Sequence, residues 1–405
     1  MTIIEHATAR AGLASALLLA LLLGAAAQAR PSAPDVAAQA TNAGPLPALG
    51  LAAGSLTVSG LSSGGYMAGQ FQVAFSSAVS GAAVLAAGPY GCSRGSVSTA
   101  VKNCSCPTGN SPWLALAQWL PATRCEVLGP PLLANFAQSA LDINREQLDN
   151  PAALAGHRVW LLSGDADPVV KPALVSAAAQ FYRDHGVPAD HLHLEHVAGA
   201  GHGLPVPDGP LACGVTASPY LTRCAGEDAA GALLAWLLAP VGAGAAPWQP
   251  AVAPRAAGLR PFDQRPYRQQ SVWDGLDDQG WLYVPAACER AGGQAAAACR
   301  LHLVFHGCQQ GRSVLGERFV QGAGYNRWAE ANQVVVLYPQ VRASRLPASA
   351  VGQTYRMNPE GCWDFWGYTD PLGDVHGVAR HFARRTAPQL SAVKRMVDAL
   401  QAAPH

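Results

Sequence analysis

The sequence feature that most constrains the fold is a glycine-serine turn between a predicted strand and a predicted helix. The strand covers residues 56–59 and the helix residues 65–77. The turn between them is Gly60-x-Ser62-x-Gly64, which matches the nucleophile elbow, a sharp turn that holds a serine in strained backbone geometry. Glycine on both sides of the serine lets other backbone approach closely. The N–H groups of the following helix would point at the serine and stabilise an oxyanion there.

The elbow motif by itself also fits an ordinary turn, because glycine and serine are abundant in this chain. A hydrolase with an elbow needs an acid and then a histidine later in the chain, each after a strand. Asp167 follows the apolar strand predicted over residues 159–163, and His202 follows another strand, predicted over residues 192–197. Asp165 is the competing acid. We favour Asp167 because the proline and valines after it would clamp its loop.

These residues predict a serine-hydrolase triad. Ser62 would be the nucleophile, His202 would take and return its proton, and Asp167 would orient the imidazole. The non-catalytic alternatives are a surface loop at the histidine and ordinary turn bonds for the aspartates. His191 and His193 lie on one side of a strand, but no third metal ligand is clearly aligned with them. We therefore expect neither a metal nor a cofactor.

A second motif lies more than 240 residues after the serine, where a predicted strand ends in Phe305-His306-Gly307-Cys308. A strand that runs into His-Gly is the oxyanion-loop pattern of these hydrolases, so the two donors would be the N–H groups of Ser63 and Cys308. In the standard order this loop precedes the serine. We therefore predict a circularly permuted α/β-hydrolase fold, a single catalytic domain over residues 51–405, in which residues from about 260 onward complete the sheet.

The amino-terminal end predicts export. Residues 1–29 combine Arg10, a leucine-rich run and an Ala-x-Ala site, which is typical of a signal peptide; the apolar core is too short for a membrane anchor. Residues 30–50 are a Pro/Ala-rich leader. No later stretch is long and apolar enough to span a bilayer. We expect a monomer that is secreted or periplasmic, with no membrane attachment after signal cleavage.

Composition supports the same compartment. The ten cysteines are an even number, which in an exported chain indicates disulfides. The pairs Cys213–Cys224 and Cys288–Cys299 would each close a short loop. Only 13% of residues are charged and the net charge is +1, so nothing in the balance indicates a nucleic-acid partner.

Taken together, the motifs resemble the polyhydroxybutyrate depolymerases that have a permuted catalytic domain. The resemblance covers about residues 50–400 and implies a serine esterase that cleaves poly(3-hydroxybutyrate) and its oligomers. It implies the same triad and the same oxyanion donors. Many secreted members carry a carboxyl-terminal polymer-binding domain; this sequence stops at His405 without one, so amorphous polymer or soluble oligomers are the expected substrates. The motifs are GLSSGGYM at 60–67, AGH at 200–202, HGCQQ at 306–310 and NPxGCWDFWGY at 358–368.

An uncharged polyester needs a groove lined by aromatic and aliphatic side chains. Trp363, Trp366 and Tyr368 crowd one glycine-flanked segment, and we expect them to bind substrate, Trp366 first; a core cluster is the alternative. A Cys308–Cys362 disulfide would hold this segment beside the oxyanion loop. Two other functions remain open: another exported carboxylesterase of the feruloyl or acetylxylan type, and a non-catalytic polymer-associated protein.

Overall fold

The structure is a computed structural model, in which residues 42–405 make up one compact unit. The predicted signal peptide, most of the predicted leader and a helix predicted over residues 111–120 lie outside the described residues. The structure describes residues 43–52, 54–106, 125–238, 247–269, 273–289, 299–344, 358–370 and 381–403.

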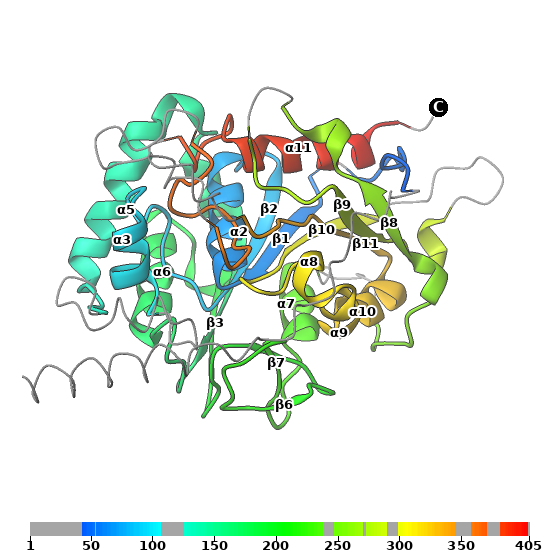
Figure 1. The fold of residues 1–405 in the computed structure, drawn as a ribbon, viewed down its shortest axis with the longest axis horizontal. Coiled ribbons are helices and arrows are strands. Elements are labelled where there is room, and N and C mark those ends of the chain that lie inside the picture. The colour runs from blue at the N-terminus through cyan, green and yellow to red at the C-terminus, as the bar shows by residue number, and fades with distance from the viewer. Residues whose placement is uncertain are drawn as a thin grey trace, which may run out of the picture. The chain divides into compact units, whose positions relative to one another are not determined.

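The centre of the fold is an eight-stranded sheet in the order β4-β3-β2-β1-β10-β11-β9-β8 (Figure 1). Strands β4 to β11 in that order are parallel, and β9 and β8 are added antiparallel at one end. Parallel strands are buried on both faces and need continuous apolar runs, as in the fully buried VVVLY of β11. The strands are β1 (Leu56–Leu61), β2 (Val79–Leu85), β3 (Arg158–Gly164), β4 (Leu192–Val197), β8 (Leu259–Asp263), β9 (Gln279–Tyr283), β10 (Arg300–Phe305) and β11 (Val334–Tyr338).

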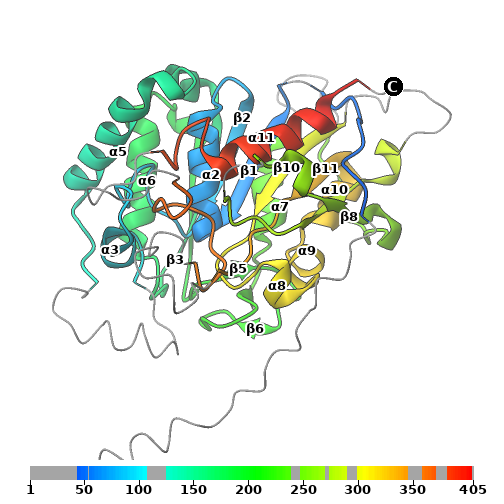
Figure 2. The same ribbon diagram turned by 45° about the horizontal axis from the view of Figure 1, so that its top comes forward.

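Helices cover both faces of this sheet. The chain passes from β1 through α2 to β2 in one direction across the sheet, and from β10 through α10 to β11 in the other. Because such crossovers are right-handed, α2 and α10 lie on opposite faces. Helix α7 packs against α10, and α11 crosses in front of the central strands in Figure 2. The main helices are α2 (Ser63–Ala74), α5 (Pro130–Asn144), α6 (Pro172–Asp184), α7 (Ala229–Leu238), α10 (Tyr325–Asn332) and α11 (Pro388–Gln401).

The late strands complete the first sheet, as predicted, because β10 pairs directly with β1. This strand order supports the interpretation of a permuted chain. The crossovers diverge between β1 and β10, which makes that position a topological switch point. Ligands of open α/β sheets bind outside the carboxyl ends of the strands at such a point.

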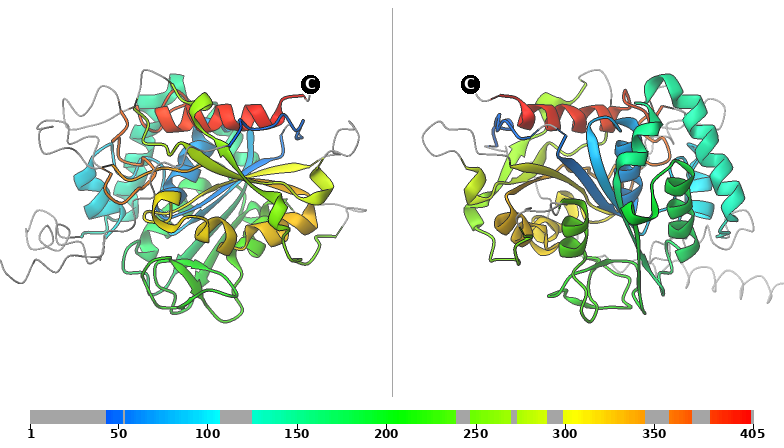
Figure 3. Two further views of the ribbon diagram at one scale, coloured as in Figure 1. Left: turned by 45° about the vertical axis from the view of Figure 1, so that its right-hand side comes forward. Right: turned by 180° about the vertical axis from the view of Figure 1, so that it is seen from behind.

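A second, three-stranded sheet was not predicted. It has the order β5-β7-β6 and is visible at the bottom of Figure 1 and in both views of Figure 3. Strands of two or three residues carry no detectable alternation, so the sequence gives no signal for them. They are β5 (Leu204–Pro205), β6 (Leu211–Ala212) and β7 (Leu221–Arg223).

The ten cysteines form five disulfides, and these include the predicted pairs Cys213–Cys224, Cys288–Cys299 and Cys308–Cys362. The other two pairs are Cys92–Cys104 and Cys106–Cys125. Within the described part of the chain, no helix has both the length and the apolar character needed to cross a bilayer.

Candidate active site

Ser62 lies at a turn between β1 and α2, with φ 58° and ψ −121°. A non-glycine residue in this region of backbone space is strained, and such residues cluster at functional sites. A Cβ on Gly60 would lie 2.1 Å from the carbonyl oxygen of Gly64, and a Cβ on Gly64 would lie 2.2 Å from that of Phe305. The turn can therefore be this sharp, and this close to β10, only with glycine on both sides.

Asp167 and His202 form a buried pair. The Nδ1 atom of His202 lies 2.8 Å from Oδ2 of Asp167, and the two side chains are 7% and 1% exposed. The other carboxylate oxygen of Asp167 accepts the N–H groups of Val169 and Val170, which fixes its orientation. The competing Asp165 is half exposed and pairs with His196 instead. Of the two candidate acids, only Asp167 contacts the histidine.

The small sheet holds His202 in place. The backbone N–H of His202 donates to Oγ1 of Thr216 at 2.9 Å, and the N–H of Leu204 donates to the carbonyl of Tyr220 at 2.8 Å. The ring of Tyr220 lies edge-on to the imidazole, with centroids 6.2 Å apart. The Cys213–Cys224 disulfide closes this segment. The unpredicted sheet is therefore the support of the histidine loop.

The oxyanion loop lies beside the elbow. Gly60 is in register with Phe305, the last residue of β10, and a Cβ on Gly307 would lie 3.3 Å from the carbonyl of Leu61. The backbone N–H of Cys308 has no hydrogen-bond partner among the described residues. The N–H of Ser63 opens α2, where the first N–H groups have no intrahelical acceptor. Two unpaired donors thus flank the serine.

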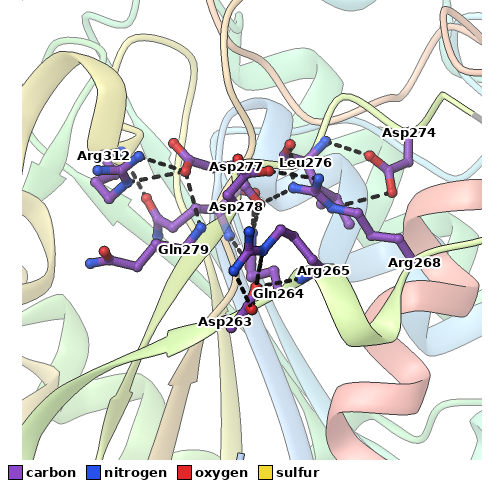
Figure 4. A network of polar contacts seen from close by, with 11 residues as sticks. Asp263, Gln264, Arg265, Arg268, Asp274, Leu276, Asp277, Asp278, Gln279 and Arg312 are labelled. Atoms are coloured by element: carbon purple, nitrogen blue, oxygen red, sulfur yellow. Dashed lines mark hydrogen bonds and ion pairs between the residues drawn. The ribbon is translucent and has the colours of Figure 1, made fainter. Parts of the chain in front are cut away.

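The loop is also anchored to the body of the sheet. Figure 4 shows Arg312, the first residue of α8 (Arg312–Leu315), reaching Asp277. Its Nε and Nη2 atoms donate to Oδ1 of Asp277 at 3.1 and 2.8 Å, and its N–H donates to the side chain of Gln340. The carboxylate of Asp277 is 4% exposed, so the guanidinium compensates a buried charge.

Strand direction brings these groups to one edge. Ser62, Asp167, His202 and Cys308 each follow one of four parallel strands, β1, β3, β4 and β10. The carboxyl ends of parallel strands share an edge, so the four residues lie at the switch-point edge of the sheet. A serine, an Asp–His pair and free N–H groups are the parts that acyl transfer requires.

The aromatic segment corrects two of our predictions. Trp363 is 0% exposed and Tyr368 is 1% exposed, so neither faces a substrate. The ring of Trp363 packs edge-on against Phe305 beneath the oxyanion loop, with centroids 4.8 Å apart, and the Tyr368 hydroxyl donates to the carbonyl of Cys362. Both belong to the core, which was the alternative interpretation. Trp366 is partly exposed and packs against Phe365.

Sequence reasoning missed the residue that shapes this segment, Asp364. Its carboxylate is 1% exposed and accepts four backbone N–H groups, those of residues 366–369, and the hydroxyl of Thr369. Burial raises the pKa of the carboxyl group, and the hydroxyl and N–H of Thr369 act in the opposite direction. The available sequence signal was a single aspartate within the aromatic run of residues 363–368.

The predicted pairing of His191 and His193 on one side of a strand is wrong, because His191 ends a 3-10 helix (Ala189–His191) and only His193 lies in β4. His193 lies 2.8 Å from Glu195 and forms one wall of a surface pocket of about 390 Å³, with Trp160 and Trp236. None of the four residues at the switch-point edge lines that pocket. Within the described ranges, no group of three or more His, Cys, Asp or Glu side chains is arranged to hold a metal ion.

Comparison with known proteins gives a consistent picture. No protein-family model matches the chain. It is 32% identical over 354 residues to a poly(3-hydroxybutyrate) depolymerase of Delftia acidovorans, covering 87% of this chain and 61% of the relative. It is 30% identical over 346 residues to a polyhydroxybutyrate depolymerase of Talaromyces funiculosus, covering 82% of this chain and 89% of the relative. The chain thus spans about three fifths of the bacterial relative and most of the fungal one.

Two solved structures are similar to it. One is a PHB depolymerase from Penicillium funiculosum, with a TM-score of 0.66, and the other a serine-to-alanine variant of a PHB depolymerase in complex with an R3HB trimer, with a TM-score of 0.65. Each shares 26% sequence identity with this chain, over 88% of this chain and 98% of the solved one.

Proposed function

This chain belongs to the polyhydroxybutyrate depolymerase family, and from that premise we propose that it is a serine esterase that hydrolyses poly(3-hydroxybutyrate) or its oligomers. The observation that carries the proposal is the buried Asp167–His202 pair at the edge where Ser62 occupies a strained elbow. The solved relative that is bound to an R3HB trimer supports the substrate class. Family membership favours a polyester over ferulate or acetyl esters.

The proposed reaction follows from the parts. His202 removes the proton from Ser62 as Oγ attacks the ester carbonyl carbon, and Asp167 stabilises the resulting imidazolium. The N–H groups of Ser63 and Cys308 donate to the oxyanion, each contributing about 3 kcal/mol. Collapse breaks the ester C–O bond, and the leaving alkoxide takes the proton from the imidazolium. A water deprotonated by His202 then attacks the carbonyl carbon of the acyl group on Ser62. Collapse breaks the bond to Oγ, which takes the proton from the imidazolium, and the acid is released.

We propose Trp366 as the remaining substrate-facing residue of the aromatic segment, supported by its partial exposure. Tryptophan offers a large apolar face to a polyester chain that is uncharged. We further propose that the protein acts as an exported monomer. Five disulfides support an oxidising compartment.

The test uses amorphous poly(3-hydroxybutyrate) and a soluble R3HB oligomer, with product analysis by chromatography. We expect 3-hydroxybutyrate or short oligomers, and we expect Ser62→Ala to abolish their release while the thermal unfolding temperature stays unchanged. Ser391→Ala is the matched control, because that hydroxyl, in α11, contacts the Pro388 carbonyl and the Gln269 side chain and none of the site residues. Release of ferulate or acetate from model esters, without 3-hydroxybutyrate from polymer or oligomer, would move the enzyme to another esterase class.

A further inference from the structure

The residue that joins the oxyanion loop (residues 306–310) to the segment that supports His202 (residues 213–222) is Gln310. We propose that Gln310 is a positioning residue for acyl transfer. Its carboxamide ties the loop of the Cys308 donor to the 213–222 segment, which supports His202. The proposal rests on the function proposed above. It assigns a role to a side chain that contacts neither the nucleophile nor the base.

One end of the carboxamide holds the oxyanion loop. The Oε1 atom of Gln310 accepts the backbone N–H of Gly307 at 2.7 Å, and the backbone N–H of Gln310 donates to the carbonyl of Gly307 at 3.2 Å. These two bonds close a tight turn around Cys308. The direction of the Cys308 N–H is therefore set by the same side chain, which is 1% exposed.

The other end of the carboxamide holds the 213–222 segment, which supports His202. The Nε2 atom of Gln310 donates to the carbonyl of Pro219 at 2.9 Å. Pro219 precedes Tyr220, whose ring borders the His202 imidazole and whose carbonyl accepts the N–H of Leu204. The hydroxyl of Tyr220 also lies 3.5 Å from Oε1 of Gln309. A displacement of either loop is thus transmitted to the other.

Backbone geometry marks the same contact. Tyr220 and Gln309 have φ values of 56° and 61°, in the left-handed region that non-glycine residues rarely occupy. Ser62, at 58°, and Ala86, at 46° directly after β2, are further such residues at this edge. Strain of this kind persists only where surrounding contacts hold it. The Gln310 bridge lies between two of these strained positions, Tyr220 and Gln309.

The other anchors of the loop do not reach the histidine. Arg312 ties the loop to Asp277 and the sheet, as Figure 4 shows, and Cys308 is tied to the aromatic segment through Cys362. Gln309 donates to Glu360 on that same segment at 2.7 Å. The long 3.5 Å contact between Gln309 and the Tyr220 hydroxyl aside, Gln310 is the one of these residues that bonds directly to the 213–222 segment, so its loss would leave only that long contact between donor and base.

The test compares Gln310→Met with Gln72→Met. Gln72 is 0% exposed and also uses both ends of its carboxamide, toward His157 and Tyr182, but it lies on the far part of α2. Both variants lose buried hydrogen bonds, and we expect both to lower Tm. With a soluble p-nitrophenyl ester, Gln310→Met should lose about 10²-fold in kcat with KM within about twofold, since a displacement near 1 Å costs that much. Gln72→Met should keep its kcat.

A second variant separates the two bonds. Gln310→Glu keeps the acceptor for Gly307 and removes the donor to Pro219, so above the titration of the carboxyl group its kcat should fall as in Gln310→Met. Wild-type kcat in Gln310→Glu would mean that only the turn within the loop matters and would overturn the tie. So would a Gln310→Met variant within about threefold of wild type, or equal kcat losses in Gln310→Met and Gln72→Met.

Hydrogen exchange gives a readout that does not depend on esterase activity. Gln310→Met should raise the exchange of amides in residues 213–222, and Gln72→Met should leave them unchanged; unaltered exchange in Gln310→Met would overturn the tie. If the wild-type chain hydrolysed no ester at all, the proposed function would fail, whereas the exchange experiment would still decide whether the two loops are joined.

Discussion

Gly64→Ala should damage catalysis by moving the oxyanion loop away from the nucleophile. The added Cβ would lie 2.2 Å from the carbonyl oxygen of Phe305 and 2.5 Å from that of His306. Relief of this overlap needs a shift of about 1 Å between α2 and the end of β10, and a misplacement of that size costs about 10²-fold in rate. Overpacking of this kind also destabilises a fold by about 1–3 kcal/mol.

The matched control is Gly69→Ala on the same helix. The nearest atom to a Cβ at Gly69 is the Tyr182 hydroxyl at 3.8 Å, which is ordinary contact. Because glycine inside a helix is less favourable than alanine, this variant should be more stable by about 0.5–1 kcal/mol. Both variants make the same glycine-to-alanine change in the same helix, but only Gly64→Ala creates a steric overlap, so a difference between them reports that overlap and not helix propensity.

The assay has two parts. Urea unfolding gives the free energy of unfolding of each variant, and turnover of a soluble p-nitrophenyl ester gives kcat and KM. We expect the loss in Gly64→Ala to lie in kcat, since the oxyanion contacts act mainly in the transition state. If Gly64→Ala kept wild-type kcat and stability, the contact between the elbow and the β10 carbonyls would not be as close as described, and the argument for the oxyanion loop would fail.

Burial lowers the pKa of His302 from 6.5 to about 3, so between these pH values the unfolded chain binds more protons than the folded one. The contribution of His302 to the free energy of unfolding should therefore fall by about 3 kcal/mol between pH 8 and pH 4. A His302→Gln variant that kept the full loss in urea titrations would refute this. Replacing Cys308 and Cys362 together by alanine opens a link across 54 residues, which should cost up to about 4 kcal/mol and lower kcat; unchanged kcat would show that the disulfide does not hold the loop. Trp366→Ala should reduce polymer turnover more than p-nitrophenyl ester turnover, and equal losses would make it structural. EDTA should leave activity intact, and inhibition that added metal reverses would contradict a serine mechanism.

The parts of the fold that sequence reasoning found are those whose signal is local. Buried parallel strands are apolar throughout, so the strand predicted over residues 159–163 is found as β3 (Arg158–Gly164). The half-exposed edge strand β4 also has its predicted bounds, 192–197. The elbow and the His-Gly motif are defined by glycine positions that backbone contacts require. Chain order then located Asp167 and His202, because an acid and a histidine after consecutive parallel strands must reach one edge.

The parts that were missed depend on long-range contacts. Gln310 belongs to the HGCQQ motif, yet nothing in that motif indicates that its carboxamide bonds to Pro219, 91 residues earlier. The small sheet, whose backbone bonds support the segment around His202, has strands of only two or three residues. Such strands are too short to show alternation.

The aromatic segment shows why residue type could not separate binding from core. Trp363 and Trp366 lie three residues apart in a segment without strand or helix period, so spacing does not fix which way each ring points. Asp364 sets the course of the chain that follows it, because its carboxylate accepts the N–H groups of residues 366–369 and the backbone winds around it. That winding leaves Trp366 partly exposed and Tyr368 buried. An Asp364→Asn variant would lose acceptor capacity at a buried position, so the exposure of Trp366, measured by fluorescence quenching, should change together with polymer turnover; a variant in which only one of the two changed would separate the segment's fold from its role.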